Sequence, residues 1–208
     1  MSNPSPNLIV ISAPSGAGKT TLVKALVERN PDLRFSVSYT TRQQRSNETE
    51  GSDYFFVNKA EFEKLHAQGE LLESAMAFDN LYATSRAQVE EHLAAGNQVI
   101  LEIDWQGARQ VRKSMPGCIT VFVLPPARPE LERRLRDRRT DSDAVIARRL
   151  QDALSDMSHA DEFDFVIIND DLATAVGEFE AVLRGQGEGS RSDSPELREK
   201  LKKYWFSP

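Results

Sequence analysis

Cysteine is almost absent from this chain, because Cys118 is the only one among its 208 residues. A lone cysteine cannot form a disulfide within the chain, which excludes the disulfide-stabilised secreted folds and favours a reducing compartment. Cys118 leads into the apolar run Ile-Thr-Val-Phe-Val-Leu. We therefore expect it to be a core residue.

Long hydrophobic runs and an excess of positive charge are lacking as well. No apolar stretch approaches the roughly 20 residues that span a bilayer, and residues 1–6 have neither the basic nor the apolar region of a signal peptide. The net charge of −6 disfavours general nucleic-acid binding. We expect a cytoplasmic protein with neither a membrane nor a nucleic acid as partner.

Apolar runs alternate with helical patterns along most of the chain, which predicts an α/β fold with a parallel sheet covered by helices on both faces. The expected strands are 8–12, 35–38, 99–104, 118–124 and 165–168. The expected helices are 18–29, 86–95, 105–114, 129–138, 143–159 and 172–184.

Residues 12–20, Ser-Ala-Pro-Ser-Gly-Ala-Gly-Lys-Thr, follow the first strand and open the first helix. This order is typical of a phosphate-binding P-loop, in which glycines turn backbone N–H groups toward an anion at a helix N-terminus. Lys19 would reach the outer phosphates, and Thr20 could offer its hydroxyl to magnesium. Ala13 stands where the motif has its first glycine, and the alternative is a glycine turn beside a surface lysine.

Residues 36–84 interrupt the alternation with short polar strands around a helix at about 59–68, which indicates a small mixed insertion. Arg42 and Arg45 lie three apart in a segment without apolar periodicity. Two guanidinium groups there could hold a phosphate dianion, or they could simply be solvated surface arginines. Tyr54 and Tyr82 could add phenolic donors.

Two acidic residues, Glu102 and Asp104, end the expected strand 99–104 and would face the same side of the sheet. Near a P-loop, such a pair suggests a role beside magnesium. Asp104 could instead cap the helix that begins near Trp105.

Arginine is concentrated between residues 128 and 149, where eight arginines meet five acids. Arg134 and Arg138 are four apart and share a helix face, and Arg149 follows a polar break. These arginines could belong to a lid that closes over phosphates. The alternative is a solvated helix paired with Glu130, Glu132 and Asp137. Beyond Arg184, a Gly- and Ser-rich stretch indicates a flexible linker.

Six spaced motifs carry a resemblance to the guanylate kinase family, from about residue 7 to 185. They are Ser38-x-x-Thr-Arg-x-x-Arg45, Gly51-x-Asp-Tyr-x-Phe56, Leu-Leu-Glu73, Tyr82-Ala-Thr84, Leu101-Glu-Ile-Asp-Trp-Gln-Gly107 and Val166-Ile-Ile-Asn-Asp-Asp171. The resemblance implies a three-layer P-loop NTPase core with a GMP-binding insertion and a helical lid. We expect the core at 1–35 and 85–185, the lid at about 128–149, the insertion at 36–84 and a linker and tail at 186–208.

The resemblance also implies Mg²⁺-dependent phosphorylation of GMP, and of dGMP, by ATP. It implies catalytic roles for Lys19, Arg134, Arg138 and Arg149. The ATP-binding residues would be Ala13, Pro14, Ser15, Gly16, Ala17, Gly18, Lys19, Thr20, Thr21 and Asn169, with Asn169 near the adenine or merely in a strand-end turn. The GMP-binding residues would be Ser38, Arg42, Arg45, Tyr54, Glu73, Tyr82, Thr84, Glu102, Asp104 and Gly107. Thr20 would bind magnesium, with Asp104 contributing through a water.

Glu73 is the residue expected to select the base. A carboxylate can accept hydrogen bonds from the N1–H and the exocyclic amine of guanine, whereas adenine presents an unprotonated N1. The alternative is an ordinary exposed strand glutamate. Two other functions compete: a kinase for AMP or dTMP, and a guanylate-kinase-like domain that binds proteins without catalysis.

Overall fold

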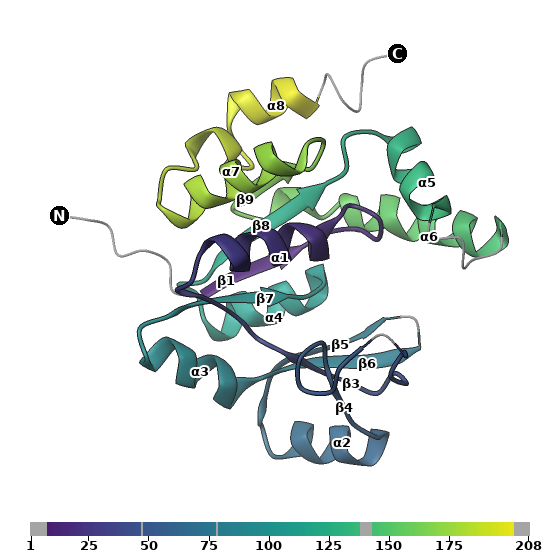
Figure 1. The fold of residues 1–208 in the computed structure, drawn as a ribbon, viewed down its shortest axis with the longest axis vertical. Coiled ribbons are helices and arrows are strands. Elements are labelled where there is room, and N and C mark those ends of the chain that lie inside the picture. The colour runs from purple at the N-terminus through teal and green to yellow at the C-terminus, as the bar shows by residue number, and fades with distance from the viewer. Residues whose placement is uncertain (1–7, 47, 78, 138–142, 202–208) are drawn as a thin grey trace. The chain divides into compact units, whose positions relative to one another are not determined.

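The computed structural model describes residues 8–46, 48–77, 79–137 and 143–201. These residues form two compact units, one of residues 11–30 and 119–201 and the other of residues 8–10 and 31–118 (Figure 1). Strand β1 (Leu8–Ser12) contributes to both units, and all five of its residues are buried.

The first unit contains most of the helices. Its elements after β1 are α1 (Lys19–Arg29), β8 (Ile119–Leu124), α5 (Arg128–Arg136), α6 (Asp143–Met157), the 3₁₀ helix η1 (Ala160–Glu162), β9 (Phe165–Ile168), α7 (Leu172–Leu183), the 3₁₀ helix η2 (Glu188–Ser190) and α8 (Pro195–Leu201). The second unit contains β2 (Leu33–Phe35), β3 (Ser38–Thr40), β4 (Phe55–Phe56), α2 (Lys59–Ala67), β5 (Leu71–Ala77), β6 (Asn80–Ser85), α3 (Arg86–Ala94), β7 (Gln98–Glu102) and α4 (Trp105–Ser114).

The larger sheet has the strand order β2-β7-β1-β8-β9. Strands β2 and β7 pair in parallel with Leu33 opposite Gln98, and β8 and β9 pair in parallel with Val121 opposite Phe165. Strands β8 and β9 are almost fully buried, as expected for parallel strands covered on both faces, and this explains their continuous apolar sequences. The predicted parallel α/β core is confirmed.

The smaller sheet has the order β4-β3-β6-β5 and mixes parallel with antiparallel pairs. Phe62 of α2 packs on this sheet in a cluster with Leu71 and Ala83. Helix α2 begins at a capping box, in which Asn58 and Glu61 each accept a hydrogen bond from the other's backbone N–H. This sheet confirms the predicted small mixed α/β segment.

The expected strand 35–38 is wrong, because the chain changes sheets there. Strand β2 ends at Phe35 in the larger sheet, and β3 begins at Ser38 in the smaller one. Between them, Oε1 of Gln88 accepts hydrogen bonds from the Ser36 hydroxyl and the Val37 backbone N–H, both at 2.8 Å. The Gln88 side chain thus accepts the hydrogen bond that the Val37 N–H would have donated to a neighbouring strand if β2 had continued.

The segment after Arg184 also differs from its prediction. Its composition predicts a flexible linker, yet residues 186–201 contain η2 and α8, and Phe165 forms an isolated bridge with Arg191. Leu197 is 2% exposed, and Lys200 forms an ion pair with Glu178 of α7. Leu197 anchors α8, which lies in the charged segment after the Gly- and Ser-rich residues 185–194. Tyr204, Trp205 and Phe206 lie outside the described residues.

Helix α7 packs against α1 within the first unit, where Glu180 forms an ion pair with Arg29 at 3.0 Å. Phe179 and Val176 supply buried apolar surface on α7. Helices α5 and α6 share a separate cluster built on Leu131 and Ile146. Among the described residues, no helix is both long enough and apolar enough to cross a membrane.

Candidate active site

The loop between β1 and α1 has the backbone of an anion-binding turn. Gly16 and Gly18 adopt φ angles of 91° and 87°, a left-handed conformation that disfavours residues with a Cβ. Gly18 is the N-cap of α1, so the N–H groups of the first helical turn point out of the helix end beside Lys19. All nine predicted loop residues, Ala13–Thr21, therefore lie in one turn and the helix start that follows it.

Side chains from other elements of the same unit pack closely against the two glycines of this loop. A methyl group on Gly16 would lie 2.8 Å from Cδ1 of Leu131 in α5, and one on Gly18 would lie 2.5 Å from Nδ2 of Asn169. These two glycines are therefore fixed by close packing as well as by their backbone angles.

The carbonyl of Ala17 is a second anchor of the loop. It accepts a hydrogen bond from Nδ2 of Asn169 at 2.7 Å and one from Nη1 of Arg134 at 3.3 Å. Nη2 of Arg134 also donates to the Asn169 carbonyl at 3.1 Å. Asn169 follows β9 and is 6% exposed. It thus lies at a strand end against the loop, and its contact with adenine stays a prediction.

Arg134 is oriented by an acid of its own helix. Oε1 of Glu130 accepts a hydrogen bond from Nε of Arg134 at 2.8 Å, while Arg133 binds the same carboxylate. The hydrogen bonds from Arg133 and then Arg134 lower the pKa of Glu130 to about 2. Glu130 is therefore ionised at neutral pH, and it holds Arg134 beside the loop.

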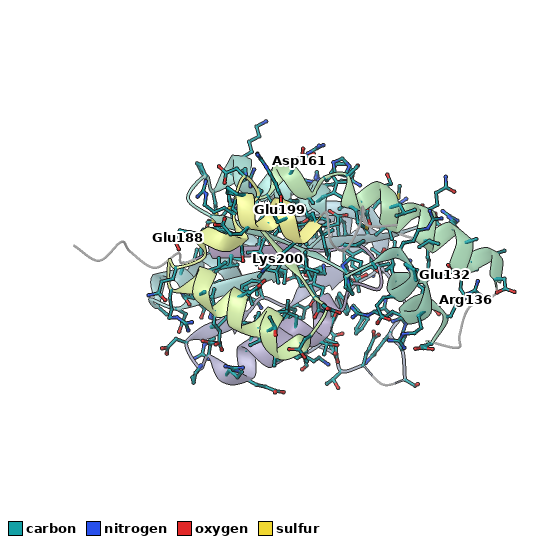
Figure 2. All side chains as sticks on the ribbon, turned by 90° about the horizontal axis from the view of Figure 1, so that it is seen from above. Glu132, Arg136, Asp161, Glu188, Glu199 and Lys200 are labelled. Atoms are coloured by element: carbon teal, nitrogen blue, oxygen red, sulfur yellow. The ribbon has the colours of Figure 1, made fainter. Side chains whose placement is uncertain are left out.

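Two of the other arginines in this region form ion pairs within their own helix. Arg136 pairs with Glu132 one turn away on α5, both labelled in Figure 2, and Arg133 pairs with Asp137. The solvated, salt-bridged helix is thus found for Arg133 and Arg136. Arg149 lies on α6, and Arg138 lies outside the described residues, so their predicted roles stay predictions.

In the second unit, Glu73 is buried rather than exposed. It is 4% exposed on β5, and its Oε1 accepts a hydrogen bond from the Thr84 hydroxyl at 2.7 Å. Ser38 lies opposite Thr84 in the register of β3 and β6 and is also buried. A buried carboxylate with hydroxyl neighbours is suited to a ligand that donates hydrogen bonds.

Helix α4 packs against β5 and approaches the Glu73 carboxylate closely at Gly107. A methyl group on Gly107 would lie 2.5 Å from Oε2 of Glu73, so only glycine leaves room for the carboxylate as placed. Gln110 fixes the helix against β5 by exchanging two hydrogen bonds with the Ser74 backbone, at 3.1 and 2.7 Å. The close approach of helix and strand therefore explains the glycine.

Arg42 and Arg45 follow β3, and both contact Glu48, an acid that was not among the predicted site residues. Both terminal nitrogens of Arg42 donate to the carboxylate of Glu48, at 3.0 and 2.8 Å. Oε2 of Glu48 also accepts from the Arg45 backbone N–H at 2.9 Å. The only sign of this contact in the sequence is that an acid follows Arg45 by three residues, in a segment without apolar periodicity.

One of the two predicted tyrosines contacts the same arginine, and the other lies beside it. The guanidinium carbon of Arg42 lies 5.2 Å from the Tyr54 ring centre. The Tyr54 and Tyr82 rings are 6.0 Å apart, edge to face. Burial first, and then the charge of Glu102, raises the pKa of the Tyr54 hydroxyl, which therefore stays protonated and able to donate.

Glu102 and Asp104 were predicted to share one face of a strand, but only Glu102 belongs to β7. The strand ends at Glu102, and Asp104 is the N-cap of α4, where its Oδ1 accepts from the Gly107 N–H at 2.7 Å. The capping interpretation of Asp104 is thus the one observed. Its link to magnesium through water stays a prediction.

Magnesium prefers oxygen ligands and is usually bound through few protein groups together with substrate phosphates and water. Thr20 is exposed in the first turn of α1, next to Lys19, and offers one hydroxyl oxygen. This donor fits an ion whose other ligands come from a nucleotide and from solvent.

Comparisons with known proteins identify the family of this chain. The family model described as guanylate kinase matches residues 5–186. A guanylate kinase from Methylococcus capsulatus is 55% identical over 190 residues, which are 91% of this chain and 93% of that protein. One from Aliivibrio fischeri is 53% identical over 181 residues, which are 86% and 87% of the two chains.

Among solved structures, a guanylate kinase from Anaplasma phagocytophilum superposes with a TM-score of 0.74 at 32% identity, covering 97% of this chain and 96% of that one. A gluconokinase from Sinorhizobium meliloti, at 20% identity and a TM-score of 0.50, covers 90% and 97% and shares the fold. From its residues, its fold and these relatives, the chain belongs to the guanylate kinase family.

Proposed function

We propose that this protein transfers the γ-phosphoryl group of Mg²⁺-bound ATP to GMP, and to dGMP, yielding ADP and the nucleoside diphosphate. The observation that carries the choice of acceptor is the buried Glu73 carboxylate, hydrogen-bonded to Thr84 and set against Gly107. Guanine offers N1–H and an amine as adjacent donors, which match a carboxylate in the way that adenine cannot.

The remaining predicted residues are proposed to bind the phosphates of the two nucleotides and the metal ion. The loop 13–21 would bind the ATP phosphates through backbone N–H groups, with Lys19 on the outer phosphates and Thr20 on the metal. Arg42, Arg45, Tyr54 and Tyr82 would hold the GMP phosphate. Magnesium would supply charge neutralisation between the two nucleotides.

The acceptor needs no general base, because a phosphate oxygen is already anionic at neutral pH. The barrier lies in bringing two polyanions into line and stabilising charge on the transferred group. Arg134, Arg138 and Arg149 are proposed for that stabilisation, and Glu130 keeps Arg134 beside the loop. We also propose a cytoplasmic location, where both nucleotides and a reduced Cys118 would be expected.

The purified protein with Mg²⁺-ATP should phosphorylate GMP and dGMP, and it should prefer GMP to AMP by about 10⁴ in kcat/KM, the range that buried polar sites reach. We expect dTMP to be a poor acceptor and ATP hydrolysis without GMP to be weak. Chelation by EDTA should abolish turnover, and excess Mg²⁺ should restore it. Equal rates with AMP and GMP would contradict the proposal.

Gly107→Ala tests the packing against Glu73. The added methyl group would lie 2.5 Å from Oε2 of Glu73, so the carboxylate must move. We expect KM for GMP to rise about tenfold or more, the equivalent of one charge-assisted hydrogen bond, with KM for ATP unchanged. Gly117→Ala is the matched control, since a methyl group there meets nothing within 4 Å. An unchanged KM for GMP would show that the carboxylate position is unimportant.

A further inference from the structure

An acid sits inside the arginine cluster proposed to bind phosphate. The side chain of Glu48 is 11% exposed, and that of its partner Arg42 is 15% exposed. Hydrogen bonds from Arg42 lower the pKa of Glu48, so it carries a negative charge at neutral pH. A fixed anion beside a phosphate site opposes the ligand by its charge, so its presence calls for a compensating role.

The geometry of the guanidinium group indicates that role. Arg42 has five N–H hydrogens, and those of Nη1 go to Glu48 and to the Gln43 carbonyl, while one of Nη2 goes to Glu48. The carboxylate therefore occupies the end of the fork. The other two hydrogens, on Nε and Nη2, lie along one side edge, which is still shaped to bind a second planar pair of oxygens.

Aromatic side chains limit the approach to Arg42 further. Its guanidinium carbon lies 5.2 Å from the ring centre of Tyr54 and 5.7 Å from that of Phe56. Tyr82 lies next to Tyr54, with the two ring centres 6.0 Å apart. These rings limit the approach to Arg42, and a phosphate would meet it along its side edge.

The segment that carries Glu48 is built to hold its carboxylate. The Glu48 N–H donates to the Arg45 carbonyl at 3.1 Å, and its Oε2 accepts from the Arg45 N–H at 2.9 Å. Nε2 of Gln44 donates to the Glu48 carbonyl at 2.8 Å. Glu48 therefore fixes both the Arg42 fork and the turn that bears Arg45.

We propose that Glu48 is a positioning residue of the monophosphate site, which presents the side edge of Arg42 to the phosphate of GMP. This inference rests on the proposed function. A long arginine side chain loses conformational freedom when it binds a ligand. Glu48 orders Arg42 before the nucleotide arrives, and this preorganisation outweighs the repulsion between carboxylate and phosphate.

Glu48→Gln is the first test, because it keeps the size of the side chain and removes its charge. We expect KM for GMP to rise about tenfold, as for one weakened charge-assisted contact, while kcat and KM for ATP change less than about twofold. Inhibition by guanosine, which lacks the phosphate, should be unaltered. Glu63→Gln, an exposed acid on α2 of the same unit, is the matched control.

A double-mutant cycle separates positioning from a general effect on structure. If Glu48 acts through Arg42, Glu48→Gln should change KM for GMP less than about twofold in an Arg42→Ala background. An unchanged or lowered KM in the single variant would overturn the inference, and a lowered one would mean that Glu48 competes with the phosphate. Equal weakening of guanosine would overturn it as well. A wild-type protein that does not phosphorylate GMP would instead refute the proposed function.

Discussion

Replacing Glu73 with alanine is expected to lower kcat/KM for GMP by about 10³ and to erase most of the preference over AMP. A hydrogen bond to a charged group contributes about 1.5–3 kcal/mol, and guanine would lose two of them. AMP gains nothing from the carboxylate, so its kcat/KM should change little. The measurement is steady-state kinetics with both monophosphates at saturating Mg²⁺-ATP.

Two further variants sharpen this test. Glu73→Gln keeps the shape but replaces one acceptor oxygen by an amide donor, which suits the unprotonated N1 of adenine better than the N1–H of guanine. We expect the ratio of GMP to AMP to fall in this variant as well. Glu70→Ala removes an exposed glutamate just before β5 and should leave the ratio intact. Retention of GMP preference in Glu73→Ala would refute the assignment of base selection to this carboxylate.

The sequence predicts the structure well where one continuous stretch of the chain specifies an element or a turn. The loop of Gly16, Gly18 and Lys19 could be predicted because strand, turn and helix follow one another. The parallel core could be predicted because strands buried on both faces, such as β8, carry continuous apolar residues. Each of these signals comes from residues that are neighbours in the sequence, so it does not depend on which distant segments meet in the fold.

Pairing between side chains could not be predicted in this way. Glu48 lies six residues from Arg42 in an irregular segment, so no helical or strand period places the two together. The contact of Asn169 with Ala17 joins residues 152 positions apart. For such contacts, the sequence indicates which groups are available, and only the fold decides which of them meet.

The errors in element boundaries have a related cause. Asp104 follows the apolar run of β7 closely and was therefore predicted as a strand residue. Its side chain instead caps α4, because the helix supplies an N–H donor three residues later. Leu197 alone, in a charged segment after a Gly- and Ser-rich stretch, is weak evidence for structure. It becomes an anchor because α8 lies against the remainder of its unit.

Lys19→Met should produce the second large effect, a fall in kcat by about 10²–10³, as found when one preorganised group that stabilises transition-state charge is removed. Lys19 begins α1 directly after Gly18, at the end of the loop whose Ala17 carbonyl is fixed by Arg134 and Asn169. Methionine keeps the length of the side chain and a high helix propensity, so the loss should reflect charge and not folding.

The lysine matters most when charge moves toward the leaving phosphate, so kcat should fall more than binding of GMP weakens. Lys24→Met provides the control, since Lys24 is an exposed lysine of the same helix. Lys19→Arg should restore little activity, because a planar fork cannot place one compact charge between two phosphates. Thermal unfolding should be alike for all four proteins. A kcat within about threefold of wild type in Lys19→Met would show that this loop does not stabilise the transferred phosphoryl group through its lysine.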